Sequence, residues 1–145
     1  MSSSTFIKLK DGSVQEDITI EDVKEMIDLY KQSTSHTAKQ VAWDYQDRAF
    51  PYALKETNEG KGQWFYLYSE QKGYHLMAIG IDYEYITVPE EKSKQRIPYI
   101  EISLSKHSTN GDKSKANEFA KFLSKKLKAE LHLFNGRIIH YHLKK

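Results

Sequence analysis

The chain has 145 residues, of which 39% are hydrophobic and 12% aromatic, and its formal net charge is +2. This composition excludes an intrinsically disordered chain and fits a single globular domain over residues 1–145. The lack of cysteine excludes disulfides and thiolate chemistry and fits a cytoplasmic protein, and the lack of a long apolar run predicts a soluble chain with no membrane partner.

The first elements are a strand and a helix. Residues 5–10 alternate in polarity, which predicts a short strand. Apolar residues then recur at helical spacing, so we expect a helix from Thr19, its N-cap, to about Tyr30. A polar break over residues 33–37 ends this helix, and residues 38–47 form either a short helix or an irregular segment.

The segment 43–52 combines four aromatic residues with two aspartates and an arginine. Such a segment can line a ligand pocket, and its candidate ligand-binding residues are Trp43, Tyr45, Asp47 and Arg48. A connection that packs its rings against the core has the same composition, and we favour that second interpretation.

Three strands are predicted in the middle of the chain, over residues 63–68, 75–85 and 97–105. Gly80 lies inside the second of them and predicts a bulge or bend. In the first, Trp64, Tyr66 and Tyr68 share one face, where aromatic rings can stack against a ligand. Strand propensity alone accounts for these aromatics equally well, so they are candidate ligand-binding residues and no more.

A second helix is predicted from an N-cap at Asp112 or Ser114 to about Lys128. Its predicted buried stripe consists of Ala116, Phe119, Ala120, Leu123 and Leu127. Its exposed lysines Lys121, Lys125 and Lys128 belong to a basic region, because residues 92–145 carry thirteen basic and four acidic side chains. Residues 1–91 carry nine basic and sixteen acidic side chains. The lysine stripe is a candidate nucleic-acid contact, although a solvated helix face has the same pattern.

The chain is expected to end in a β-hairpin around Asn135-Gly136, a pair that is typical of a two-residue turn. That turn places Leu131 opposite His140 and puts His132 on the other face of the hairpin. His140 and His142 then share a face and are weak candidates for metal ligands. Two partly exposed histidines without a local third ligand are the simpler interpretation, so we expect no metal and no other cofactor.

These elements predict an α+β fold, with a mostly antiparallel sheet of five or six strands, two main helices packed on one face and a C-terminal β-hairpin. The segments Phe6-Ile7-Lys8-Leu9, Thr19 to Tyr30 and Trp43 to Tyr52 resemble a family of small Bacillus-type proteins known as a domain of unknown function. The resemblance implies a bacterial, cytosolic α+β domain, and it assigns no catalytic or binding residue.

No set of residues has the spacing that catalysis needs, so we expect no catalytic residues and no enzyme activity. The favoured function is a non-catalytic module that binds a protein partner or associates with itself, as a homodimer or larger complex. The alternative is nucleic-acid binding through the basic C-terminal half and the aromatic face of the sheet.

Overall fold

The computed structural model describes residues 3–10, 13, 17–41, 52–60, 62–88 and 93–141. Its elements are β1 (Ser3–Lys8), α1 (Ile20–Val41), β2 (Ala53–Lys55), β3 (Trp64–Tyr68), β4 (Leu76–Val88), β5 (Ser93–Leu104), α3 (Asn110–Leu127), β6 (Glu130–His132) and β7 (Ile138–His140). The strands form one antiparallel sheet in the order β2-β3-β4-β5-β1-β6-β7. This confirms the α+β fold class. The strand beyond the expected six is β2, whose three exposed residues show no alternation.

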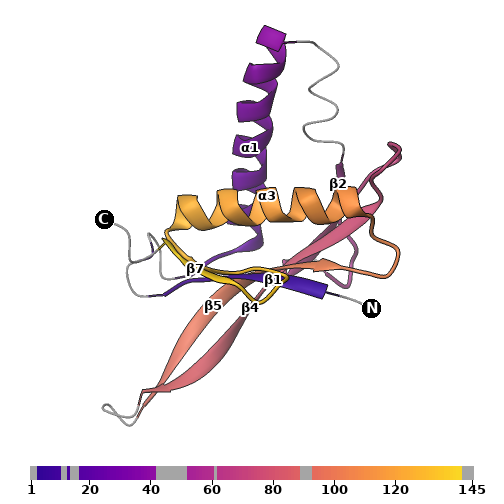
Figure 1. Cartoon of the computed structure of the whole chain (residues 1–145). Coiled ribbons are helices and arrows are strands. Elements are labelled where there is room, and N and C mark those ends of the chain that lie inside the picture. Colours follow the sequence, from indigo (N-terminus) through magenta and orange to yellow (C-terminus); the bar gives the residue numbers. More distant parts are fainter. Residues whose placement is uncertain are drawn as a thin grey trace.

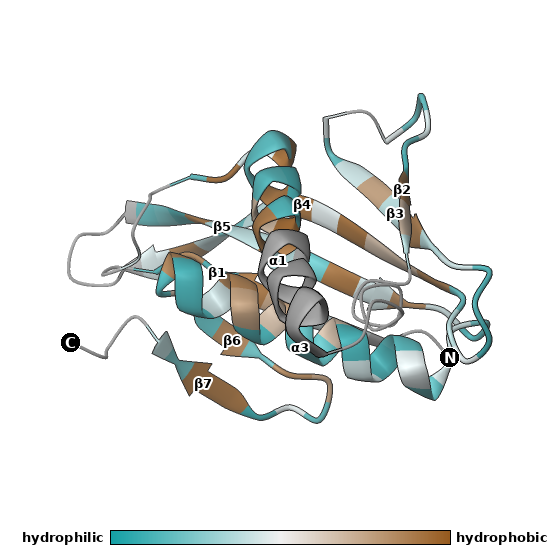
Figure 2. Cartoon of the chain, turned by 90° about the horizontal axis from the view of Figure 1, so that it is seen from above, coloured by the Kyte–Doolittle hydropathy of each residue, from teal (hydrophilic) through white to brown (hydrophobic). Residues whose placement is uncertain are grey.

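Both helices lie on the same face of the sheet (Figure 1). α3 packs on β1, β4, β5 and β6, whereas α1 packs on α3 and rises away from the sheet. Figure 2 shows the same crossing from above. The core fills the layer between α3 and the sheet, with Ile7, Phe65, Ile100, Phe119 and Leu123 among its fully buried side chains. The opposite face of the sheet is not covered by any element that the structure describes.

α1 begins as predicted but is longer than predicted. The Thr19 side chain accepts a hydrogen bond from the Asp22 N–H, and the Asp22 carboxylate accepts one from the Thr19 N–H. This reciprocal pair closes the first turn. The expected break at residues 33–37 is absent, because the helix continues to Val41. Serine and threonine lower helix propensity only slightly, and residues 20–41 contain no glycine or proline to end the helix.

α3 begins earlier than the predicted cap at Asp112 or Ser114. Its N-cap is Thr109, which accepts a hydrogen bond from the Asp112 N–H at 3.0 Å. Asp112 is therefore the third residue of the helix, and its carboxylate accepts the Thr109 N–H at 2.8 Å. The buried stripe of α3 is the predicted one and consists of Ala116, Phe119, Ala120, Leu123 and Leu127.

The Asp112 carboxylate also binds two other segments, although this side chain is fully buried. It accepts hydrogen bonds from the hydroxyl of Tyr52 at 2.5 Å, the N–H of His75 at 3.0 Å and the N–H of Leu76 at 3.2 Å. Burial and this hydrogen bond raise the pKa of Tyr52 far above its usual range, so the phenol stays a donor. One carboxylate thus joins the start of α3 to the start of β4 and to Tyr52.

The backbone beside this carboxylate is packed too closely for any side chain at position 111. A Cβ on Gly111 would lie 2.2 Å from the carbonyl oxygen of Gly73. The hydroxyl of Thr109 donates to that same oxygen at 2.7 Å. The first turn of α3 therefore rests directly on the turn between β3 and β4.

The C-terminal hairpin is present, but its turn is not the predicted two-residue turn. The N–H of Leu133 donates to the carbonyl oxygen of Arg137 at 2.8 Å, and the N–H of Gly136 donates to that of Leu133 at 3.0 Å. The loop therefore has three residues and ends at Gly136, whose φ of 86° is left-handed. This is a turn closed by a bulged glycine, which the Asn-Gly signal alone does not distinguish from the shorter turn.

The extra loop residue shifts the strand register by one. Leu131 pairs with Ile139, where the prediction placed His140. His132 consequently lies on the same face as His140, although the prediction placed the two on opposite faces. A shift of one residue moves every side chain of a strand to the other face. The predicted separation of the two histidines was therefore wrong.

β4 and β5 are the longest strands, and they pair continuously as far as Val88 and Ser93. β5 thus begins before the predicted start at residue 97. Of the predicted bulge or bend at Gly80, the bulge is absent, because the ladder with β5 runs unbroken through this residue and Gly80 is the last residue of β4 paired with β3. Gly80 lies opposite Trp64 instead, and a Cβ there would be 3.0 Å from the Trp64 Cβ.

We predict that Asp112→Asn destabilises the fold by about 3 kcal/mol, because the amide presents a donor to groups that are themselves donors and leaves buried donors unpaired. Chemical unfolding in urea measures the change. Asp28→Asn, at an exposed acid on α1, is the matched control and should change stability by less than about 0.5 kcal/mol. Equal stability of the two variants would contradict the role given to Asp112.

Candidate functional site

The sheet face opposite the helices carries the candidate site, and we call it the open face. Residues that pair across neighbouring strands share a face, so the register identifies the side chains that point away from the helices. Those of the long central strands and their neighbours include Ser4, Phe6, Lys8, Trp64, Tyr66, Tyr68, Ala78, Gly80, Asp82, Glu84, Tyr99, Glu101, Ser103, Glu130 and His132. The face thus combines aromatic rings with carboxylates and small residues.

The structure brings the predicted residues Trp64, Tyr66 and Tyr68 together on the open face. The rings of Trp64 and Tyr66 meet edge to face with centroids 4.9 Å apart. The ammonium of Lys55, on the neighbouring strand, lies 4.5 Å from the centre of the Tyr68 ring. All three aromatic side chains are partly exposed, while Phe65 between them is buried. The alternation read from the sequence is therefore confirmed.

A hollow of about 230 Å³ lies beside Trp64 on this face. It is lined by Gln63, Trp64, Ala78, Gly80, Ile81, Asp82, Glu101 and Ser103. The register explains it, because Trp64, Gly80 and Glu101 follow one another across three strands. Gly80, the central residue of that row, has no side chain. The backbone of β4 between Trp64 and Glu101 therefore forms the floor of the hollow.

Glu101 is the polar side chain held most firmly in this hollow. Its Oε2 accepts hydrogen bonds from the hydroxyl of Ser4 at 2.6 Å and from that of Ser103 at 3.1 Å. No Lys, Arg or His of the described ranges forms an ion pair with it. Sequence reasoning did not select Glu101, because its position beside Gly80 depends on the strand register.

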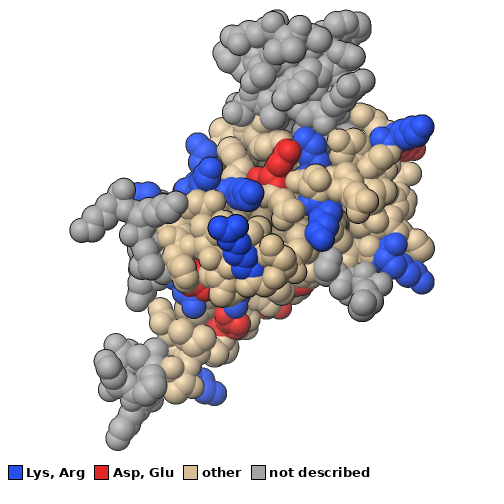
Figure 3. All heavy atoms as spheres, in the orientation of Figure 1, with Lys and Arg blue, Asp and Glu red and all other residues tan. Residues whose placement is uncertain are grey.

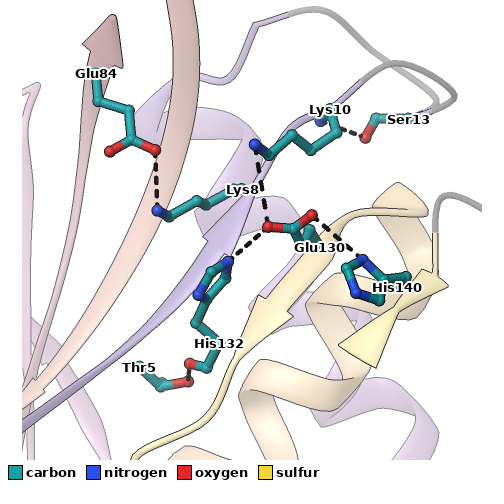
Figure 4. Close-up of polar contacts among 8 residues, drawn as sticks. All are labelled: Thr5, Lys8, Lys10, Ser13, Glu84, Glu130, His132 and His140. Carbon is teal, nitrogen blue, oxygen red and sulfur yellow. Dashed lines mark hydrogen bonds and ion pairs between the residues drawn. The ribbon is translucent and has the colours of Figure 1, made fainter. Parts of the chain in front are cut away.

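A second polar cluster on the open face is centred on Glu130 (Figure 4). Its Oε1 lies 2.7 Å from His132 Nε2 and its Oε2 lies 3.3 Å from His140 Nδ1. The Nζ of Lys10 lies 4.0 Å from the same carboxylate. The corrected hairpin register is what brings the two imidazoles to one carboxylate. Sequence reasoning missed this cluster for that reason.

The predicted metal pair is not assembled by the described part of the chain. His142 lies outside the described residues, and His140 contacts the Glu130 carboxylate. Within the described ranges, no group of three His, Asp or Glu side chains has the arrangement of a metal site. The two imidazoles and the carboxylate form a hydrogen-bonded cluster instead.

The pKa of Glu130 reflects opposing effects. Burial on its own would raise the pKa of this carboxyl group. The hydrogen bond with His132 and the positive charges of Lys10, His132 and His140 outweigh burial, so the pKa lies below its ordinary value of 4.5. The cluster therefore favours the charged carboxylate.

The lysine stripe lies on the other side of the molecule. Lys121, Lys125 and Lys128 are exposed along α3 and at its C-cap. In Figure 3 basic side chains gather around α3, which covers the inner face of the sheet. The aromatic open face and the lysine stripe are therefore separate surfaces. The alternative function, nucleic-acid binding, combined the two in one binding surface.

Two further observations bear on the predicted sites. The candidates Trp43, Tyr45, Asp47 and Arg48 lie outside the described residues. The helices that the structure describes include none that is long and apolar enough to cross a membrane.

We predict that Glu130→Gln lowers stability by about 1 kcal/mol near neutral pH, because it removes a charge-assisted hydrogen bond. A carboxylate whose pKa is lowered in the folded state stabilises the fold at pH values above its unfolded pKa of 4.5. This stabilisation is lost as the pH falls through the lower pKa of the folded state. The difference between variant and wild type should therefore shrink below pH 4.5.

Urea unfolding midpoints across a pH series measure this prediction. Glu25→Gln, at an exposed acid on α1, serves as the control and should differ little from wild type at any pH. A stability difference between Glu130→Gln and wild type that stays constant down to strongly acid pH would contradict the prediction.

Comparison with known proteins agrees with this fold. A family model described as a domain of unknown function (DUF1885) matches residues 3–143. The crystal structure of a protein of unknown function from Bacillus stearothermophilus is similar, with a TM-score of 0.54 and 38% sequence identity over 85% of this chain and 88% of that one. No curated protein matches the chain. The resemblance seen in the sequence is confirmed, and the chain belongs to the DUF1885 family of domains of unknown function.

Proposed function

We propose that this domain is a non-catalytic binding module that associates with a second copy of itself through the outer halves of β4 and β5. We call this segment, residues 81–88 and 93–98, the arm. The observation that carries the proposal is that the arm extends beyond the rest of the sheet (Figure 1). In the described chain its two strands pair with each other, and no further strand continues the sheet beyond them.

The first support for this proposal is the edge of β4 that faces away from β5. β3 pairs with β4 as far as Gly80. Among the described residues, the last hydrogen bond on that side runs from the Ile81 N–H to the Gln63 carbonyl oxygen at 2.9 Å. The remaining residues to Val88 give an edge of about 25 Å at the usual rise of a strand. Long exposed edges are templates for the addition of another strand, and proteins that do not use them usually block them.

The side chains of the arm also support self-association. Tyr83 and Tyr85 are 46% and 58% exposed, and their rings contact each other with centroids 5.5 Å apart. The guanidinium of Arg96 lies 4.5 Å from the centre of the Tyr83 ring and 3.2 Å from Asp17. This contact anchors the base of the arm to the segment before α1. Tyrosine and arginine are the residues most enriched at the centres of protein interfaces.

A second copy is the partner that the charges of the arm favour. The described arm carries two acids, Asp82 and Glu84, and two bases, Lys94 and Arg96. Two arms therefore meet without a net repulsion, and an antiparallel contact between them closes as a symmetric dimer. A strongly acidic or basic partner would gain no steering from such a neutral surface.

The remaining parts of the proposal concern chemistry and location. The open face holds two carboxylate clusters, in which Glu101 accepts hydrogen bonds from the hydroxyls of Ser4 and Ser103, and Glu130 contacts two imidazoles. Among the described contacts, neither cluster combines a hydroxyl nucleophile with a histidine base. We therefore propose a function without catalysis. The sequence lacks cysteine and the similar solved structure is bacterial, which supports a bacterial cytoplasmic protein.

We predict a homodimer at micromolar concentration, with twice the chain mass of 16.9 kDa by light scattering. The double variant Tyr83→Lys/Tyr85→Lys should be monomeric, because it places four like charges at the contact between two arms. Both tyrosines are exposed, so circular dichroism should show an unchanged fold.

Ile138→Lys is the matched control, because Ile138 is 44% exposed and lies on the edge strand at the other side of the sheet. This variant should remain dimeric. A monomeric wild-type chain would overturn self-association. A dimer that survives the tyrosine changes but is broken by Ile138→Lys would place the interface at β7 and overturn the role of the arm.

A further inference from the structure

The hollow beside Trp64 has the features of a ligand site, independent of self-association. Neighbouring strands are about 4.8 Å apart, so in the row Trp64, Gly80, Glu101 the backbone that carries Trp64 lies about 10 Å from the backbone that carries Glu101. The volume of about 230 Å³ is below the usual range for drug-sized ligands, which begins near 300 Å³. The hollow therefore suits a small molecule with few heavy atoms.

The charge of the lining determines the kind of ligand. Asp82 and Glu101 are its charged side chains, and none of the lining residues is basic. Elsewhere on the open face the carboxylates have cationic neighbours, since Glu84 lies 2.9 Å from Lys8 and Glu130 lies beside Lys10. For Asp82 and Glu101 no such neighbour exists among the described residues. The hollow thus concentrates negative charge that the described fold does not neutralise.

The arrangement of Glu101 is also fixed in advance. Hydrogen bonds from Ser4 and Ser103 hold one carboxylate oxygen. A group held in this way loses little conformational entropy when a ligand binds. Hydrogen bonds from neutral hydroxyls leave the full negative charge in place.

The aromatic wall completes the site. Trp64, which lines the hollow, is only partly buried. Its indole is held by the edge-to-face ring of Tyr66 and by Gly60, where a Cβ would lie 2.5 Å from the indole carbons Cδ2 and Cε2. Indole is the aromatic group that attracts cations most strongly through its ring face. An alkyl chain also gains apolar contact with the same ring, which a bare metal ion cannot make.

We propose that this hollow binds a small alkylammonium ion, with the ammonium group at Glu101 and Asp82 and the alkyl chain against Trp64. The carboxylates supply charge-assisted acceptors, and the indole supplies apolar and cation–π contact. The residues with small or no side chains, Ala78 and Gly80, leave the room for the chain.

The test uses n-butylammonium as the probe and the fluorescence of Trp64 as the readout. The sequence contains two tryptophans, so Trp43→Phe leaves Trp64 as the single tryptophan, which excitation at the red edge selects over the tyrosines. We expect a saturable change with n-butylammonium, and no saturable change with n-butanol or n-butyrate. Equal binding of n-butanol, or no saturation with n-butylammonium, would overturn the proposal.

Two variants test the roles of the carboxylates. Glu101→Gln keeps the shape of the side chain and should weaken binding at least about tenfold, because it removes the charge that the ammonium meets. Asp82→Asn, at an exposed position that is safe for folding, should weaken binding by a smaller factor. Glu84→Gln is the matched control, because this carboxylate lies on the same face but is paired with Lys8.

Unchanged binding by Glu84→Gln, with weaker binding by the other two variants, supports the site. Equal weakening by all three variants would mean that the ion senses the overall charge of the face, and would overturn the assignment to the hollow. Far-ultraviolet circular dichroism and the unfolding midpoint of each variant show whether a loss of binding comes from a loss of fold.

Discussion

The position of α3 depends on one buried carboxylate. Asp112 accepts hydrogen bonds from the N-cap of its own helix, from the start of β4 and from Tyr52. A buried carboxylate is tolerated only when its acceptor capacity is used, and these bonds use it. They hold the first turn of α3 on the turn between β3 and β4, at the point where Gly111 allows backbone to touch backbone. The helix is thereby placed across the inner face, and no described element covers the other face.

The unequal charge of the two halves of the sequence has a partial structural explanation. Several opposite charges from the two halves meet in space, because β1 pairs with both β5 and β6. Lys10 lies near Glu130, and Asp17 pairs with Arg96. The acid-rich start of α1 and the lysines of α3 belong to two helices that pack on each other, with the Tyr30 hydroxyl donating to Glu118 at 2.7 Å. Asp17–Arg96 joins an acid of the first half to a base of the second, whereas Lys10–Glu130 joins a base of the first half to an acid of the second. Contacts between the halves therefore neutralise only part of the asymmetry along the chain.

The predictable features of the fold were those that depend on local periodicity. Alternation along β3 identified Trp64, Tyr66 and Tyr68 as outward residues, and helical spacing identified the buried stripe of α3. Features set by a single residue in a turn were not predictable. The bulged Gly136 moved His132 to the face of His140, and the cap at Thr109 turned Asp112 from a surface cap into a buried anchor. Both candidate clusters on the open face depend on such register choices, so the sequence alone did not identify them.

The construction of the open face argues for a role beyond folding. Gly80 has a packing reason, because the Trp64 Cβ approaches it closely. The neighbouring row has no such reason, since Tyr66, Ala78, Ser103 and Ser4 follow one another across four strands and are all partly exposed. β-Branched residues at these central positions would favour the strand and shield the backbone better. A face that keeps small residues and an unneutralised carboxylate beside an indole gives up stability that its strands could provide. Departures of this kind are expected where a surface is shaped to bind something.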